Sequence, residues 1–381
     1  MKNGRLAYIN TISFLTSGLL GLLLVANQTL FQTVCDYLKI EDASVWIGFF
    51  SSAFFIGMVA VAIVSGEMAE RIGKKNVISI FSFVVLGGSL VLAFCETPVA
   101  ALIGFLMVGM GFGAVEGLIN GVVVDENRGS SSSILNRTFV FFSAGAILSP
   151  LTIGNFIENG GDWHYIYYVT AALYAALGIL FLFAKTTKLP AAKKKKGMVS
   201  FSLLKNKFFL LPCIMIFIYL GAEAGATNWT PNIFASTALG SYALAAFWAA
   251  TGISRLVLSF IKNYDLHKTL TLHSILAAAG FAGIPIFNQY TAVCLVFFAL
   301  VGYGLGPLWP SYFSLGTDAS GEFTGAGSGL VMFFSSLGGA VLSLVVGMFT
   351  GFEIMWLCMA FVAAALILQR VFVSLKKKEI K

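Results

Sequence analysis

The sequence predicts an all-α membrane protein with twelve transmembrane helices in two six-helix bundles, with both chain termini in the cytoplasm. Three observations predict this fold class: the composition, a series of long apolar segments, and the position of the basic residues between those segments. Hydrophobic residues make up 58% of the 381 positions and charged residues only 11%. So few charges do not cover the surface of a soluble protein of this length.

Twelve apolar segments are each long enough to cross a bilayer, whose hydrocarbon core requires about 20 residues of helix. The first six predicted helices occupy 7–34, 45–66, 75–95, 99–124, 133–156 and 163–184. The other six occupy 207–228, 240–262, 269–287, 290–316, 325–350 and 352–374. The first segment is too long for a signal-peptide core and lacks a small-residue cleavage site, so we interpret it as a retained span.

The basic residues predict the orientation of these helices. The formal net charge is +7, and the basic residues lie between the apolar segments rather than in one patch suited to nucleic acid. With both termini cytoplasmic, all 24 lysines and arginines except Lys39 lie in a cytoplasmic segment or at the cytoplasmic end of a span. Lysine and arginine near span ends resist translocation, so a topology shifted by one span would reverse the rule.

A basic segment predicts the division into two bundles. Residues 185–205 contain Lys193–Lys196 and a proline, and separate an N-terminal bundle, 1–184, from a C-terminal bundle, 206–381. Paired six-span halves are typical of alternating-access transporters, which bind solute near the bilayer midplane between the halves. The expected localisation is the plasma membrane, as a multi-pass protein, and the charge asymmetry fits a bacterial inner membrane.

The cysteines and histidines do not indicate a metal or redox site. Five cysteines are scattered without a C-x-x-C spacing, and the three histidines show no ligand spacing. The sequence leaves open whether Cys35 and Cys95 form a disulfide. We expect no cofactor and no metal.

The segment between the second and third predicted helices carries a signature. It reads Gly66-Glu-Met-Ala-Glu70-Arg71-Ile-Gly73-Lys74-Lys. This resembles the G-x-x-x-D-R-x-G-R-R/K loop of the major facilitator superfamily, with glutamate in place of the usual aspartate. The resemblance implies that the acid and Arg71 help to latch the two halves on the cytoplasmic side. An ordinary basic loop is the alternative interpretation. A weaker counterpart ends at Arg255 in the eighth span.

Three further segments resemble the fucose permease branch of that superfamily, the fucose–galactose–glucose:proton symporters. The fourth span matches its G-x-G-x-x-E-x-x-x-N pattern through Glu116 and Asn120, and Asn136 follows in a partial match to R-L-N-x-x-Q. The seventh span resembles a Y-x-G-A-E segment through Glu223, and the tenth a W-P-x-x-F-S-L-G segment beginning at Trp309. The resemblance implies a sugar symporter.

One departure from the branch affects the coupling ion. The fucose permease has an aspartate in its first span that is implicated in proton coupling, whereas the first span here has Asn27 and Gln28 and no acid before Asp36 at its outer end. The glutamine expected after Asn136 is also absent, since Arg137 follows it. Coupling and substrate therefore do not follow from the resemblance alone.

Two carboxylates lie deep in predicted spans, Glu116 and Glu223, out of seventeen acids. Ionisable groups inside a bilayer are costly, so each is a hypothesis for a functional site. The superfamily resemblance implies that spans 1, 4, 7 and 10 line the central cavity, and both acids lie on two of these. Burial favours the neutral carboxyl, so uptake of a proton is one hypothesis and participation in a Na⁺ site another. A structural glutamate bonded to a neighbouring span is the alternative.

Helical spacing places polar groups on shared faces. Glu116 and Asn120 are four residues apart, and Tyr219, Glu223 and Thr227 repeat that spacing. Glycines at 109, 113, 117 and 121 form a separate stripe that allows a neighbouring helix to approach. The candidate substrate-binding or ion-coupling residues are Asn27, Gln28, Glu116, Asn120, Asn136, Tyr219, Glu223, Thr227, Asn228, Trp248, Trp309 and Tyr312.

The predicted function is cation-coupled uptake of a small polar solute, a monosaccharide first. Aromatic faces with amide and carboxylate groups suit a sugar ring, which has apolar faces and a hydroxyl rim. Proton-driven export of drugs or metabolites is the alternative, because the fifth span partly resembles the G-x-x-x-G-P-x-x-G-G antiporter signature. A membrane scaffold and an enzyme are disfavoured, because long cytoplasmic domains and a nucleophile–base pair are lacking. The expected partners are the solute and membrane lipid, not nucleic acid, for a monomer.

Overall fold

The computed structural model describes residues 2–127, 131–186, 201–234, 236–261, 265–321 and 324–380. Within these ranges all regular secondary structure is helical, and twelve segments are long and apolar enough to cross a membrane. The predicted fold class is therefore confirmed. The cytoplasmic location of the termini stays a prediction, and most of the predicted linker 185–205, namely 187–200, lies outside the described residues.

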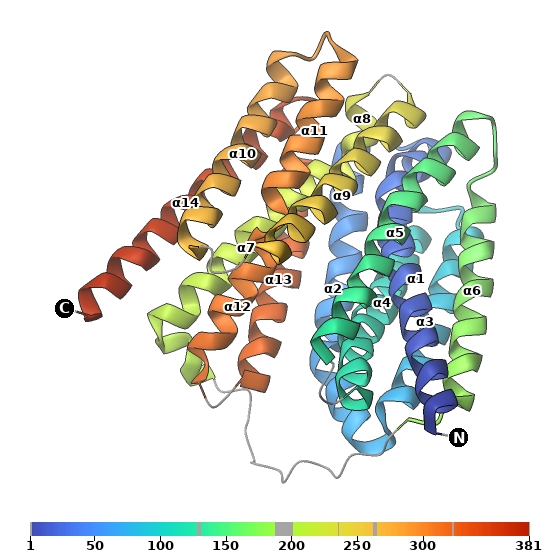
Figure 1. The fold of residues 1–381 in the computed structure, drawn as a ribbon. Coiled ribbons are helices and arrows are strands. Elements are labelled where there is room, and N and C mark those ends of the chain that lie inside the picture. The colour runs from blue at the N-terminus through green and yellow to red at the C-terminus, as the bar shows by residue number, and fades with distance from the viewer. Residues whose placement is uncertain are drawn as a thin grey trace. The chain divides into compact units, whose positions relative to one another are not determined.

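The chain divides into two compact units, Met1–Ala43 with Phe49–Lys195, and Ser44–Gly48 with Lys196–Lys381. The first six helices are α1 (Lys2–Tyr37), α2 (Ala43–Ile72), α3 (Lys74–Ala93), α4 (Pro98–Glu126), α5 (Ser131–Glu158) and α6 (His164–Phe183) (Figure 1). The others are η1 (Phe201–Lys205), α7 (Lys207–Asn228), α8 (Thr230–Ile233), α9 (Thr237–Phe260), α10 (Leu266–Ile286), α11 (Thr291–Leu305), α12 (Leu308–Ala319), α13 (Thr324–Gly347) and α14 (Glu353–Ile380).

In the first unit α1 packs against α5, and α3 packs against α4 and α6 (Figure 1). Glycine allows the closest of these approaches. A Cβ at Gly21 would lie 2.0 Å from the carbonyl oxygen of Phe142, and one at Gly145 would lie 2.0 Å from that of Gly18. The backbones of α1 and α5 are therefore in direct contact, the packing that small residues permit in membrane helices.

The predicted glycine stripe on α4 has two kinds of position. A Cβ at Gly109 would lie 1.9 Å from the carbonyl oxygen of Phe54, and one at Gly113 2.9 Å from Cα of Met58, so both positions pack on α2. A Cβ at Gly121 would lie 2.8 Å from Nζ of Lys74. No heavy atom of the described structure lies within 4 Å at Gly117. The packing role predicted for the stripe is therefore wrong at that position.

The connection between α2 and α3 is shorter than predicted. The loop expected over 66–75 is helical as far as Ile72, and α3 begins at Lys74, so one residue separates the two helices. That residue, Gly73, has φ +90°, a conformation that side chains other than glycine rarely adopt. The apolar part of the α2 sequence ends at Val64, and the helix continues because its polar residues form backbone bonds equally well outside a membrane.

In the second unit α7 packs against α12, α13 and α14, and α10 lies between α11 and α14. The tenth predicted span, 290–316, consists of two helices, α11 and α12, with Gly306 and Pro307 between them. Proline removes a backbone donor and so interrupts the helix. All five cysteines are buried free thiols, so Cys35 and Cys95 are not bridged.

Candidate functional site

The carboxylate of Glu223 is held by its own helix. The hydroxyl of Tyr219, one turn earlier on α7, donates to Oε2 of Glu223, and Thr227, one turn later, donates to the Glu223 carbonyl at 2.9 Å. Tyr219 and Thr227 are buried, whereas Glu223 is half-buried. The predicted four-residue spacing therefore places one ionisable group between two hydroxyl-bearing side chains. Asn228 is also buried, and its Oδ1 lies 3.5 Å from the Thr227 hydroxyl.

A positive charge from another helix acts on this pair. The guanidinium of Arg255, on α9, has an electrostatic interaction with both Glu223 and Tyr219. Its Nε donates to the carbonyl oxygen of Gly306 at 2.8 Å. Tyr312, on α12, is fully buried. The second unit thus places a carboxylate and a guanidinium within electrostatic range of each other.

The two predicted tryptophans take packing positions in the second unit. Trp248 is buried, and its ring meets Phe247 edge to face at 5.4 Å between centroids. Trp309 is half-buried, stacks on Phe313, and donates from Nε1 to Oγ of Ser335 at 3.1 Å. Both side chains have protein neighbours in the described structure, so packing explains their placement without a ligand.

The other carboxylate within a span, Glu116, lies on α4 in the first unit and is half-buried. Asn120, one turn later, donates from Nδ2 to the Glu116 carbonyl at 3.4 Å rather than to its carboxylate. The charge of Glu116 acts on the hydroxyl of Tyr174, on α6. That hydroxyl is buried and has no hydrogen-bond partner within the described residues. The first unit therefore also places a phenol near its carboxylate.

The amides predicted in the first span are buried. Asn27 accepts a hydrogen bond at Oδ1 from the hydroxyl of Tyr167, on α6, at 3.1 Å. Its Nδ2 has no partner in the part of the chain that the structure describes. Gln28 is also buried. The side chain of Asn136 lies outside what the structure describes.

The signature residues after the second span contact helix ends within the first unit. Nζ of Lys74 pairs with Oδ2 of Asp125, at the end of α4, at 2.7 Å. Arg71 lies 4.0 Å from Glu67, one turn away on α2, and both side chains are exposed. The side chain of Glu70 lies outside what the structure describes, and a Cβ at Gly66 would meet no described heavy atom within 4 Å. The latch between halves stays a prediction.

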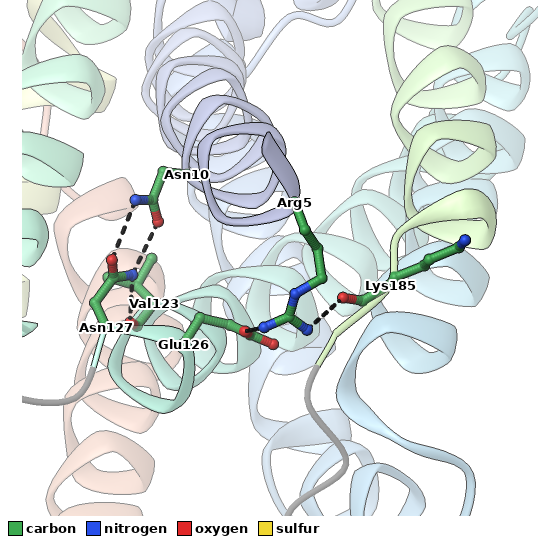
Figure 2. A network of polar contacts seen from close by, with 6 residues as sticks. All are labelled: Arg5, Asn10, Val123, Glu126, Asn127 and Lys185. Carbon is green, nitrogen blue, oxygen red and sulfur yellow. Dashed lines mark hydrogen bonds and ion pairs between the residues drawn. The ribbon is translucent and has the colours of Figure 1, made fainter. Parts of the chain in front are cut away.

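A polar network that the sequence did not predict joins α1, α4 and the end of α6 (Figure 2). Arg5 pairs with Glu126 at 2.9 Å and donates to the carbonyl of Lys185 at 2.9 Å. Asn10 and Asn127 exchange two amide hydrogen bonds, of 3.1 and 2.8 Å. The Glu126 side chain is only 1% exposed. These contacts fix one end of the first unit.

The model of the Major Facilitator Superfamily matches residues 6–343, most of the chain. The chain belongs to the Major Facilitator Superfamily. It is a multi-pass membrane protein, and the resemblance drawn from its sequence is confirmed. The superfamily members reported below with a stated activity are transporters rather than enzymes.

Curated members of the superfamily resemble most of the chain at low identity. A TsgA homolog from Buchnera aphidicola is 24% identical over 314 residues, covering 79% of this chain and 78% of the relative. The glucose/mannose transporter GlcP of Bacillus subtilis is 21% identical over 358 residues, covering 88% of this chain and 86% of the relative. The similarity extends over both units.

Solved structures of superfamily members share the fold. The xylose transporter XylE from E. coli superposes with a TM-score of 0.78 at 11% identity, covering 97% of this chain and 99% of that one. The nucleoside transporter NupG gives 0.73 at 18% identity, covering 98% and 99%. A variant of the E. coli fucose:proton symporter FucP gives 0.65 at 18% identity, covering 96% and 99%.

Two tyrosines near the predicted polar residues, Tyr167 and Tyr174, were not among the predicted site residues, although their spacing in the sequence could have identified them. Tyr167 and Tyr174 are seven residues apart on α6, so they lie on one face of the helix. Both are fully buried, Tyr167 on Asn27 and Tyr174 near Glu116. A pair of hydroxyls at heptad spacing in a span indicates a polar partner on the facing helices.

Proposed function

We propose that this superfamily member is a secondary active transporter that takes up a monosaccharide across a bacterial inner membrane by alternating access, coupled to protons. The names of GlcP, XylE and FucP, which refer to sugars, support a sugar as the first solute to test. NupG is named for nucleosides, which also contain a sugar ring, and provides the second class of probe.

The observation that carries the proposal is the Glu223–Tyr219 pair within an apolar helix. An ionisable group inside a membrane span is costly, so its presence there indicates a functional role. The hydroxyl of Tyr219 occupies one carboxylate oxygen, and the carboxylate keeps further acceptor capacity for a proton. A change in its charge alters the interaction with Arg255, and this gives proton binding a physical effect on the protein.

The same geometry favours H⁺ over Na⁺ at Glu223. Hard cations in proteins are surrounded by several oxygen ligands, whereas the contacts described here supply one carboxylate and one hydroxyl. A proton needs only one lone pair, so the small number of oxygen ligands does not oppose its binding.

Transport by the purified protein in liposomes tests the proposal. Radiolabelled D-glucose is the first probe, followed by D-xylose, L-fucose and uridine, under an imposed pH gradient or an imposed Na⁺ gradient. We expect accumulation driven by the pH gradient in the wild type. Glu223→Gln should lose that accumulation but retain exchange of labelled for unlabelled solute, because exchange requires no net proton movement.

The matched control is Glu96→Gln, which removes a carboxylate from an exposed connection between α3 and α4. It should accumulate solute as the wild type does. Accumulation that is unchanged in Glu223→Gln, or that follows the Na⁺ gradient, would refute proton coupling at this residue. Proton-driven movement of bulky apolar cations, without a response to sugars or uridine, would instead favour the exporter.

A further inference from the structure

Two prolines remove two backbone donors from the tenth span. In an α-helix the N–H of each residue bonds the carbonyl four residues earlier. Pro307 therefore leaves the carbonyl of Tyr303 without its helical donor, and Pro310 does the same to Gly306. The backbone stays right-handed helical between α11 and α12, with φ −48° and ψ −51° at Gly306 and φ −80° and ψ −16° at Pro307. A carbonyl without a donor is costly inside a membrane, so each of the two requires a replacement.

Side chains from two neighbouring helices supply the replacements. Nδ1 of His273, a buried residue of α10, lies 3.0 Å from the Tyr303 carbonyl oxygen. Because a carbonyl only accepts, Nδ1 of His273 carries the proton. Nε of Arg255, on α9, donates to the Gly306 carbonyl at 2.8 Å. Each carbonyl that has lost its helical donor to a proline is therefore bonded by one side chain.

Glycines in the tenth span allow α9 and α10 to come this close. A Cβ at Gly302 would lie 2.1 Å from the carbonyl oxygen of Phe247, on α9, and one at Gly304 would lie 2.4 Å from the backbone nitrogen of Ala277, on α10. The end of α11 is therefore in backbone contact with both helices. After the break, α12 packs mainly against α7 and α13 instead. The two donors thus come from the helices that hold α11, and they bond to carbonyls at its end.

A third side chain bonds to the same segment where no donor is missing. Oγ1 of Thr251, one turn before Arg255 on α9, donates to the Gly302 carbonyl at 3.0 Å. The backbone N–H of Gly306 also donates to that carbonyl, at 2.9 Å, because residue 306 is not a proline. The bond from Thr251 is therefore an addition to the helical bond, whereas the bonds from Arg255 and His273 are substitutes for one.

We propose that Arg255 and His273 are positioning residues, which replace the helical donors removed by Pro310 and Pro307 and so fix the direction in which α12 leaves the break. α12 carries Trp309 and Tyr312, two of the candidate solute-binding residues, near its start. The inference rests on the proposed function for its effect on solute binding. Each of the two side chains is required because of one proline and not because of the other.

Thermal unfolding of the full-length protein in detergent tests this pairing. Arg255→Met removes a donor and keeps a long side chain, and His273→Phe removes a donor and keeps an aromatic ring against Tyr303. Each should lower the melting temperature by about 4–8 °C, the effect of leaving one buried acceptor unbonded. Pro310→Ala supplies a backbone N–H to Gly306, so Arg255→Met should cost little in that chain. Pro307→Ala supplies one to Tyr303, so His273→Phe should cost little in that chain.

The crossed pairs and Thr251 are the matched controls. Arg255→Met should cost as much with Pro307→Ala as in the wild type, and His273→Phe as much with Pro310→Ala. Thr251→Val should cost the same with either proline replaced, because Gly302 keeps its backbone donor. Rescue of one side-chain variant by both prolines, or by neither, would overturn the assignment of the donors.

Uptake of labelled D-glucose into liposomes tests the positioning role. Arg255→Met should raise the KM for D-glucose about tenfold, as for the loss of one hydrogen bond, and Pro310→Ala in the same chain should restore it. Thr251→Val should keep the wild-type KM. A KM that is unchanged in Arg255→Met, or that Pro310→Ala does not restore, would overturn the positioning role. Absence of uptake by the wild type would overturn the proposed function alone, because the unfolding measurements need no solute.

Discussion

The contact between α2 and α4 leaves no room for a side chain at Gly109, and alanine there should destabilise the first unit. The added Cβ would lie 1.9 Å from the oxygen, 2.7 Å from the carbonyl carbon and 2.8 Å from Cα of Phe54, all of them backbone atoms. Ordinary contact begins at 3.4 Å, so the helices must separate by about 1.5 Å, the difference between 3.4 and 1.9. Overpacking of this kind costs up to about 3 kcal/mol, and alanine recovers roughly 1 kcal/mol of helix propensity.

The expected net loss is therefore about 2 kcal/mol, which lowers the melting temperature by about 4–8 °C for a unit of this size. A thiol-reactive fluorescent dye measures it, because all five cysteines are buried and react only on unfolding. Gly117→Ala is the control on the same helix, since no described atom lies within 4 Å. It should gain roughly 0.5–1 kcal/mol. Equal melting temperatures for the two variants would show that α2 and α4 are not in backbone contact.

Two further predictions concern charged groups at the ends of helices in the first unit. Arg5→Gln removes the guanidinium 2.9 Å from Glu126. Since Arg5 is 35% exposed, the cost should be about 1–2 kcal/mol, below that of a fully buried pair, and Glu126→Gln in the same chain should recover most of it. If the losses in free energy of unfolding of the two single variants simply added up in the double variant, the ion pair between Arg5 and Glu126 would be refuted. Between α5 and α6, hydrogen bonds from the side chain and the backbone N–H of His164 lower the pKa of Asp162. A lowered pKa stabilises the fold above the ordinary aspartate pKa, and the effect is lost as pH falls through the lowered value. The melting temperature of the wild type should therefore exceed that of Asp162→Asn at neutral pH and converge with it in acid, and a constant difference would refute this.

The positions of the helices could be predicted because the membrane imposes them locally. A span requires about 20 apolar residues whatever it packs against, so predicted 207–228 and observed Lys207–Asn228 coincide. The connection after α2 was misplaced for the same reason. Polarity marks where a helix leaves the hydrocarbon, whereas the helix itself ends only at Gly73, where φ becomes positive.

The contacts of the candidate site could be predicted only within one helix. The spacing of Tyr219, Glu223 and Thr227 predicts a shared face, and all three are bonded along it. Contacts between helices depend on their rotation and depth, which a single sequence does not determine. The bond from Tyr167 to Asn27 spans 140 residues, and the pair of Arg5 with Glu126 spans 121. These polar contacts were therefore not predicted.

The break in the tenth span could be predicted in part: its position follows from the sequence, but its contacts with other helices do not. Its G-P-L-W-P segment identifies the two carbonyls that lose a donor, because the rule of four residues needs no tertiary information. It does not identify which side chains replace the donors, since His273 and Arg255 lie 30 and 51 residues from their acceptors. Prolines within a span thus predict where a side chain must bond to backbone.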